Sequence, residues 1–541
     1  MPVLKIYFER FSKMTGLPRE RILDRLPYLG LDIESVEEDS VRIEYNPNRA
    51  DFSSDYGIGR ALRGLVGLET GVPTYTVAPG KTRVTVDENL AKIRPYISCA
   101  AARGLKLDDE TVRQLISMQE DLHNGIGRKR RKVSIGLHNL DVVRPPIAYR
   151  ALPRTFEFTP LGSMARMSIG AILETTETGI AYGGILEGAS GYPVLYDSKG
   201  TVLSFPPIIN GRDTKVDIGT KNLFIDVTST DERVGDDALA IVCAALADAG
   251  GAIESVSIEH PRTSRVTPDL TPTKMKFSEG LARSMTGLDL TSSQMRDCLR
   301  KSRLDLDERG DAVVPRYRVD ILHPVDLAEE VAIGYGLDRI EPNYPSSRDA
   351  GSLDRAVVAM DGVSESMSRA GFIETMNYDL VDEASLYTKF SRPSDAKVEV
   401  ENPRTIEHSL LRDSILPSLI SVLSRNVKAS YPQKVFEVGR VYLRRGSAIA
   451  EESHLGALVA HSSSTFSEAK MYLRPLIVEK LGGELSTRAG NHWAFAEGRC
   501  AEVLVDGRSL GYIGELRPSA VASFGLDVPV AGFEIDLAGF A

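Results

Sequence analysis

Residues 317–336 read YRVDILHPVDLAEEVAIGYG, and this stretch gathers acidic side chains where a strand pattern gives way to a helical one. Asp326, Glu329 and Glu330 are spaced i, i+3 and i+4, so a helix that opens at Asp326 carries all three on one face of its first turn. Asp320 lies a short turn upstream. Four carboxylates that converge repel one another, and a hard divalent cation such as Mg²⁺, which prefers oxygen ligands, relieves that repulsion.

A purely structural interpretation of the same stretch stays open. Asp326 followed by Glu329 is a D-x-x-E pattern typical of a helix N-cap, and acidic side chains are electrostatically favoured near a helix N-terminus. The pattern alone therefore fits either a metal site or a capped helix.

The helix–strand–helix module around this stretch is predicted to occur twice. The sequence MTGL at residues 14–17 recurs at 285–288, and Asp55 matches Asp326 at the same offset. In the first copy the positions of the four acids hold Arg49, Asp55, Ile58 and Gly59. Only the capping carboxylate is common to both copies. Capping does not require the three further acids, which favours the metal interpretation.

Length and composition indicate a multidomain globular chain. Its 541 residues correspond to about three to five domains of about 100–200 residues each, and its 42% hydrophobic residues are ordinary globular usage. No apolar run approaches the ~20 residues of a membrane-spanning helix, so no membrane association is expected. The four cysteines are scattered without a C-x-x-C pair, and we expect free thiols and a cytoplasmic location.

The charge balance limits the kind of nucleic-acid contact that is expected. The net charge is −10 at pH 7, whereas a protein that grips nucleic acid over its whole surface is usually basic. Any such contact should therefore be local. The densest basic run, RKRRK at residues 128–132, is either a phosphate contact or a solvated loop.

Apolar periodicity and Pro- or Gly-rich breaks predict an α+β multidomain fold. A helix is expected over residues 51–65 and a linker over 71–80, and Thr291 with Gln294 predicts a capping box at a helix start. The expected domains span residues 1–80, 81–262, 270–345 and 350–541.

The motif R-x-D-I-x-x-x-x-D-L-x-E-E-V-A at residues 318–332 resembles the signature of the B5 domain of phenylalanyl-tRNA synthetase β subunits. Further motifs resemble the other domains of that subunit, in its archaeal and eukaryotic form, and follow the same order along the chain. The first domain (B1-like) is matched at 46–64, the B3/B4 domain at 94–96, 119–123 and 204–210, and the catalytic-like domain at 401–403, 411–416, 435–439 and 514–516. One departure is Arg517, where such subunits often have His after Gly-Glu-Leu.

The resemblance implies an α2β2 enzyme that charges tRNA-Phe with phenylalanine using ATP, with the ATP and the aminoacylation site in the α subunit. The residues agree, because the sequence holds no G-x-x-x-x-G-K-[ST] loop and no convincing pair of class II ATP-binding arginines. The last domain is then expected to be a class II catalytic-like antiparallel sheet that is non-catalytic. The resemblance also implies that Asp320, Asp326, Glu329 and Glu330 bind Mg²⁺.

An editing site is physically reasonable in such an enzyme. Phenylalanine and tyrosine differ by one hydroxyl, and an apolar pocket rejects an added hydroxyl only about 100-fold, so a second hydrolytic site improves accuracy. The resemblance implies that the B3/B4-like domain hydrolyses mischarged Tyr-tRNA-Phe. The candidate residues are Gln119, Arg130, Ser204, Asn210 and Asp226, with Leu195 shaping the pocket.

Each editing candidate also has a structural interpretation. Asn210 precedes Gly211 in a common turn pair, Asp226 and Ser204 fit strand residues, and Gln119 fits a solvated helix face. His123 and His138 lack a partner at zinc-ligand spacing and are interpreted as structural. Two other functions remain open for the chain: a stand-alone deacylase of mischarged tRNA, and a non-catalytic scaffold for an α-like partner.

Overall fold

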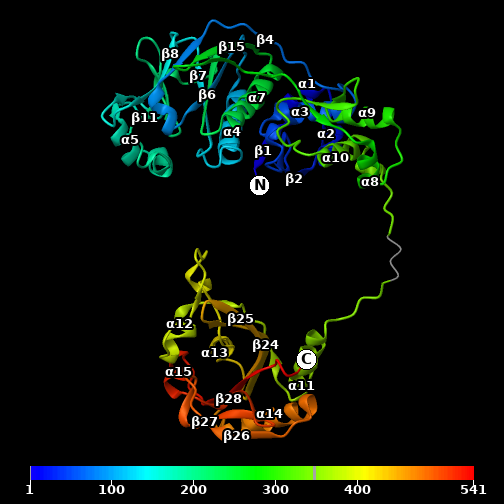
Figure 1. Cartoon of the computed structure of the whole chain (residues 1–541), viewed down its shortest axis with the longest axis vertical. Coiled ribbons are helices and arrows are strands. Elements are labelled where there is room, and N and C mark those ends of the chain that lie inside the picture. The colour runs from blue at the N-terminus through cyan, green and yellow to red at the C-terminus, as the bar shows by residue number, and fades with distance from the viewer. Residues whose placement is uncertain (1, 345–348, 541) are drawn as a thin grey trace. The chain divides into compact units, whose positions relative to one another are not determined.

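The computed structural model describes residues 2–344 and 349–540 and separates into two compact units, Met1–Tyr344 and Pro345–Ala541 (Figure 1). Both units mix helices with sheets, which confirms the expected α+β multidomain class. The predicted domain end at residue 345 lies outside the described residues, and the finer boundaries stay predictions. No helix in the described ranges is both long and apolar enough to cross a membrane.

The first unit begins with a three-stranded antiparallel sheet of order β1-β3-β2, covered by helices. The predicted helix over 51–65 begins only at Asp55, because the side chain of Ser54 caps it by accepting from the Gly57 N–H. A short 3-10 turn, Ala50–Phe52, precedes it. The elements are β1 (Val3–Tyr7), α1 (Phe8–Thr15), α2 (Arg19–Arg25), β2 (Leu31–Val36), β3 (Ser40–Tyr45) and α3 (Asp55–Leu65).

The same unit ends with a second module that has the same element sequence and the corresponding strand order, β17-β19-β18. The repeated MTGL ends a helix in both places: the Thr15 hydroxyl donates to the Phe11 carbonyl and the Thr286 hydroxyl to the Ala282 carbonyl, each at 2.7 Å. The elements are β17 (Thr273–Lys276), α8 (Glu279–Thr286), α9 (Ser292–Lys301), β18 (Asp305–Leu306), β19 (Asp311–Val314) and α10 (Pro324–Tyr335).

The two modules pack closely against each other. A Cβ at Gly64, in α3, would overlap the carbonyl oxygen of Lys301 at the end of α9. The Gly71 N–H donates to the Arg300 carbonyl at 2.7 Å. The predicted capping box of Thr291 and Gln294 is present at the start of α9.

The chain segment between the two modules forms an 11-stranded mixed sheet that contains β13-β12-β11-β8-β5-β15-β6-β14-β7, with β4 and β16 also paired to β15. The expected linker over 71–80 is not wholly irregular, because β4 (Val77–Ala78) pairs in parallel with β15 (Ala252–Glu259). Two helices, α4 (Asp109–Asn124) and α7 (Glu232–Asp248), pack on one face of the β6, β14 and β7 strands through a large apolar core.

The opposite face of those strands packs against the other half of the sheet through a second core that includes Phe224, Leu195 and Leu203. The remaining elements are β5 (Arg83–Val86), β6 (Tyr96–Arg103), β7 (Val133–Asn139), β8 (Ile147–Leu152), β9 (Glu157–Phe158), β10 (Met167–Ser168), α5 (Ile169–Thr175), α6 (Glu177–Tyr182), β11 (Tyr192–Tyr196), β12 (Val202–Phe205), β13 (Ile209–Asn210), β14 (Leu223–Ser229) and β16 (Ser264–Thr267).

The second unit contains a seven-stranded sheet of order β20-β24-β25-β29-β28-β27-β26, antiparallel except for the β20/β24 pair. Helices α11 (Arg355–Arg369) and α14 (Phe466–Leu481) cover one face, and α13 (Leu416–Arg425) with α15 (Pro518–Ser523) packs on the other. The strands are β20 (Ile373–Glu374), β24 (Gln433–Arg445), β25 (Ala448–Ala460), β26 (Leu485–Ala489), β27 (Phe495–Val505), β28 (Arg508–Leu516) and β29 (Val530–Asp536); β21 (Leu380–Val381), β22 (Val398–Glu399), β23 (Leu410–Leu411) and α12 (Glu383–Leu386) lie outside this sheet.

Candidate functional site

Arg318 lies at the centre of the acidic stretch of the second module. Its buried guanidinium donates to both oxygens of Asp320, the Nη2–Oδ2 distance being 2.7 Å, and also to Oε1 of Glu330. Burial works against both charges, yet the two carboxylates raise the pKa of Arg318 and its guanidinium lowers the pKa of Asp320. Two of the four predicted metal ligands are therefore already neutralised by an arginine.

Asp326 holds the start of α10 together. Its Oδ2 accepts from the backbone N–H groups of Leu322 and His323, each at 2.7 Å. The prediction that Asp326 opens the helix is wrong: the N-cap is His323, and the helix begins at Pro324, whose fixed φ suits the first helical position. Asp326 occupies the third position, where a carboxylate can reach back to free N–H groups.

Glu329 is the exposed member of the acidic set. Partial burial, together with the negative charges of Glu330, Asp326 and Asp320, raises its pKa. Among the described residues, the four acids do not supply three donor atoms within 4.8 Å of one another, a spacing found only for Glu452, His454 and Asp536. In this arrangement the four acids do not fit a single ion.

The buried Asp226 of β14, itself an editing candidate, contacts a second candidate, Ser204, and one histidine, His138. Its Oδ1 accepts from the Ser204 hydroxyl of β12 at 3.3 Å and lies 2.6 Å from Nε2 of His138 in β7. The other imidazole nitrogen of His138 lies 3.0 Å from the Thr214 hydroxyl. All four side chains are buried, so they form one continuous polar line between the two halves of the sheet.

Gly136 makes room for this line. It is the β7 residue directly opposite Asp226 in the β14/β7 ladder. A Cβ at Gly136 would clash with Oδ1 of Asp226 and lie 2.5 Å from Nε2 of His138. A residue without a side chain is therefore required for the carboxylate and the imidazole to meet.

The other editing candidates surround this line without contacting Asp226 through any described hydrogen bond. Asn210, in β13, pairs in register with Ser204. Arg130 donates to the Ile208 carbonyl at 3.0 Å and to Oε1 of Glu120 at 2.7 Å, and the Gln119 amide donates to the Ile135 carbonyl at 2.6 Å. Leu195, the residue expected to shape the pocket, is fully buried in the core beneath and pairs with Ser204.

The basic run RKRRK forms a turn between α4 and β7. Arg128, Lys129 and Arg130 have φ angles of 49°, 54° and 64°, a left-handed conformation that is costly for residues with side chains. Arg94 donates to the Arg131 carbonyl at 3.2 Å and anchors the turn. Arg130 points inward, whereas Arg128, Lys129 and Arg131 are exposed.

His138 is a neighbour of the editing candidates that sequence reasoning does not nominate. The lack of zinc-type spacing favours a structural interpretation, and strand alternation places His138 on the same face as Gly136. That alternation was the available signal. It could not reveal Asp226 as the partner, because the pairing depends on the β14/β7 register.

Family models match two regions of the chain. The model described as "tRNA synthetase B5 domain" matches residues 275–337, and that described as "Phenylalanyl tRNA synthetase beta chain CLM domain" matches residues 340–537. A curated relative from Archaeoglobus fulgidus named "Phenylalanine--tRNA ligase beta subunit" is 40% identical over 546 residues, which cover 100% of this chain and 99% of the relative. The chain belongs to the family of phenylalanine–tRNA ligase β subunits.

Two further members of the family are also similar to this chain. The β subunit from Methanococcoides burtonii is 38% identical over 99% of this chain and 100% of its own length. The crystal structure of an N-terminal fragment of the phenylalanyl-tRNA synthetase β subunit from Pyrococcus horikoshii is 35% identical, with a TM-score of 0.60, and covers 62% of this chain and all of the fragment. The chain is thus a subunit of an aminoacyl-tRNA synthetase of archaeal type, which confirms the expected enzyme class.

Proposed function

We propose that the chain is the β subunit of a phenylalanine–tRNA ligase that works with an α subunit, as an α2β2 tetramer, to charge tRNA-Phe. The observation that carries this proposal is sequence similarity over the whole chain to curated β subunits, with 40% identity in one case. ATP, with its Mg²⁺, and the aminoacylation site belong to the α subunit in this proposal. The complex acts in the cytoplasm, in keeping with four cysteines that are buried and free.

The second unit is proposed to be a class II catalytic-like domain that has kept the fold without the activity. Its seven-stranded, largely antiparallel sheet supports this assignment. On the α13 face, the fully buried Arg412 donates to Glu437 at 2.6 Å and lies 3.0 Å from Asp379. An arginine committed to two carboxylates is not free to bind a phosphate group, which is consistent with a role as scaffold and interface.

The central domain is proposed to hydrolyse Tyr-tRNA-Phe near Ser204, Asn210 and Asp226. A site whose polar groups hydrogen-bond a substrate hydroxyl discriminates strongly against a substrate that lacks it, and Asp226 with Ser204 supplies buried polar groups at this position. In the described part of the chain the Ser204 hydroxyl donates to Asp226 and makes no hydrogen bond to a histidine, so no imidazole base is placed to activate it as a nucleophile. We therefore assign these residues to positioning the substrate and a water rather than to covalent catalysis.

Mg²⁺ at Asp320, Asp326, Glu329 and Glu330 remains a proposal, and the donor set does not favour it. Arg318 would have to release Asp320 and Glu330, and Asp326 would have to leave the backbone N–H groups that it caps. No step of the function depends on an ion at this position.

Co-expression with the α subunit tests the proposal. The complex should charge tRNA-Phe, whereas the chain alone should not. Asp226→Asn and Asn210→Ala should leave charging intact and abolish Tyr-tRNA-Phe hydrolysis. Asp197→Asn is a matched control, because Asp197 is an equally buried aspartate of the same domain that binds only backbone N–H groups.

The same experiment separates the other two functions. Hydrolysis of Tyr-tRNA-Phe by the chain alone, with no charging after the α subunit is added, would support a stand-alone deacylase. Complex formation with no effect of Asp226→Asn on hydrolysis would support a scaffold without editing.

A further inference from the structure

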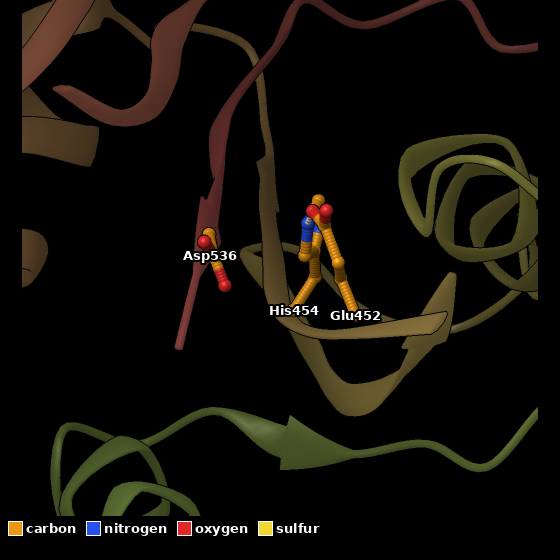
Figure 2. Close-up of side chains that lie close together, drawn as sticks. All are labelled: Glu452, His454 and Asp536. Carbon is orange, nitrogen blue, oxygen red and sulfur yellow. Dashed lines mark ion pairs between the residues drawn. The ribbon is translucent and has the colours of Figure 1, made fainter. Parts of the chain in front are cut away.

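Three potential metal ligands meet at one end of the sheet in the second unit. Glu452 and His454 belong to β25, and Asp536, on β29, is directly paired with His454 in the ladder. Strand alternation places the side chains on the face opposite α11 and α14. Donor atoms of the three side chains all lie within 4.8 Å of one another, and Figure 2 shows Glu452 and His454 extending in parallel beside the strand that carries Asp536.

The imidazole of His454 is held in one orientation by a fourth residue. Its Nδ1 lies 2.9 Å from Oε1 of Glu534. Glu534 is itself fixed, because it accepts from the Ser414 hydroxyl at 2.6 Å and from the Ile415 N–H at 3.1 Å. A proton on Nδ1 leaves the lone pair of Nε2 free, which is how an outer carboxylate orients a metal-binding histidine.

Nε2 of His454 has no hydrogen-bond partner although it is buried. Oε2 of Glu452 lies 3.5 Å away, within ion-pair distance but without hydrogen-bond geometry. The His454 side chain is only 15% exposed, so water gives little compensation. A buried nitrogen that faces a carboxylate without a hydrogen bond is the observation that points to a further ligand at this cluster.

Each carboxylate keeps one oxygen for a further ligand. One oxygen of Glu452 pairs with Arg445, and the other is the one that faces His454. Oδ1 of Asp536 accepts from the Ala538 N–H at 2.9 Å. The second oxygen of Asp536 makes no hydrogen bond that the structure describes.

We propose that Glu452, His454 and Asp536 form a binding site for a transition-metal ion such as Zn²⁺. Zinc binds His nitrogen at about 2.0–2.1 Å and carboxylate oxygen at about 2.0–2.2 Å, so tetrahedral ligands lie roughly 3.3 Å apart. The Glu452–His454 separation is already close to that value, and Asp536 has to approach by a side-chain rotation. An imidazole ligand suits Zn²⁺ better than Mg²⁺. Water fills the fourth position, and the ion ties β25 to β29.

Metal titration of the purified full-length chain, stripped with EDTA and free of the α subunit, tests the proposal. Wild type should bind one equivalent of Zn²⁺ that is lost in His454→Gln and in Asp536→Asn. Co²⁺ should give the visible absorption of a tetrahedral complex in wild type only. Glu534→Gln should weaken binding about 10- to 100-fold, because it removes the negative charge of the group that orients His454.

His461→Gln is the matched control. His461 is a half-buried histidine of the same unit, and its Nε2 lies 2.7 Å from Oε2 of Glu468. Among the described residues, His461 belongs to no group of three potential metal ligands. This variant should retain the equivalent of Zn²⁺. Circular dichroism and assembly with the α subunit should show that the His454 and Asp536 variants remain folded. Equal Zn²⁺ binding by wild type, His454→Gln and Asp536→Asn, or no Zn²⁺ binding by wild type, would overturn the proposal.

Discussion

Arg49 lies 3.9 Å from Asp320, and these two residues occupy equivalent positions in the two repeated modules of the first unit. Arg49 also pairs with Asp51 at 3.0 Å, and Asp320 pairs with Arg318. The same position of the repeat therefore carries a positive charge in the first module and a negative charge in the second. The two charged side chains lie close together where the modules pack. In this arrangement Arg49 and Arg318 offset the negative charges of Asp320 and Glu330.

Arg318→Met should destabilise the first unit strongly. The substitution leaves Asp320 and Glu330 buried near each other without their shared partner, and breaking a buried pair in this way costs about 3–5 kcal/mol. The midpoint of urea unfolding, followed on the full chain, measures the loss. Arg154→Met is the control, because Arg154 forms an exposed pair with Glu174 that is worth about 0–1 kcal/mol. Equal midpoints for the two variants would contradict the buried network.

Gly136→Ala should disrupt the polar line beneath the editing candidates. The added methyl group collides with Asp226 and His138, and overpacking of this kind costs about 1–3 kcal/mol. Hydrolysis of Tyr-tRNA-Phe by the complex should fall with charging preserved. Gly184→Ala in the same domain meets no atom within 4 Å and should behave as wild type. Normal hydrolysis in Gly136→Ala would show that the Asp226–His138 contact is unimportant for editing.

Local signals in the sequence predicted local structure well. The capping box at Thr291 depends on residues within one turn, and it is present. The acidic stretch was located, and a capping role for Asp326 was one of its two interpretations, but the contact of Asp320 with Arg49 was not predicted, because Arg49 belongs to the other module. Contacts between residues that lie far apart in the sequence produce no periodic pattern that could be recognised from the sequence.

The editing candidates divide in the same way. Ser204 and Asp226 were chosen by resemblance, and the structure brings them into contact. His138 was left out because its role comes from the strand register rather than from its neighbours in sequence. The metal-ligand group of Glu452, His454 and Asp536 was also missed, since its third member lies on a strand far along the chain.

The exposed residues of the basic turn are predicted to contact tRNA phosphates. Replacing Arg128, Lys129 and Arg131 with Gln should lower the affinity of the complex for tRNA-Phe and make it less sensitive to salt. Each lost phosphate contact should reduce the slope of log K against log salt concentration by about 0.7–0.9. Filter binding at several salt concentrations measures this slope. The matched triple variant Lys274→Gln, Lys276→Gln and Arg309→Gln, in another exposed basic set, should keep the wild-type slope.

His492 should make the second unit less stable in acid. It packs among aromatic rings, stacked on Tyr512 at 4.7 Å and near Trp493 at 4.8 Å, and burial lowers its pKa to about 4. The unfolded chain takes up a proton near the ordinary value of 6.5, whereas the folded chain does so only near 4. The stabilising contribution is therefore complete above pH 6.5 and is lost as the pH falls from 6.5 to about 4.

The difference between the unfolded and folded pKa values of His492 corresponds to at most about 3 kcal/mol of folding free energy, at about 1.4 kcal/mol per pKa unit. His492→Phe keeps an aromatic ring at the position and removes the titration. The free energy of unfolding of the variant, measured from pH 7 to pH 4, should fall less steeply than that of wild type by up to this amount. His408→Phe is the control, because His408 is exposed and lies outside this aromatic cluster. Parallel pH profiles for wild type and His492→Phe would show that the imidazole is not kept neutral by its surroundings.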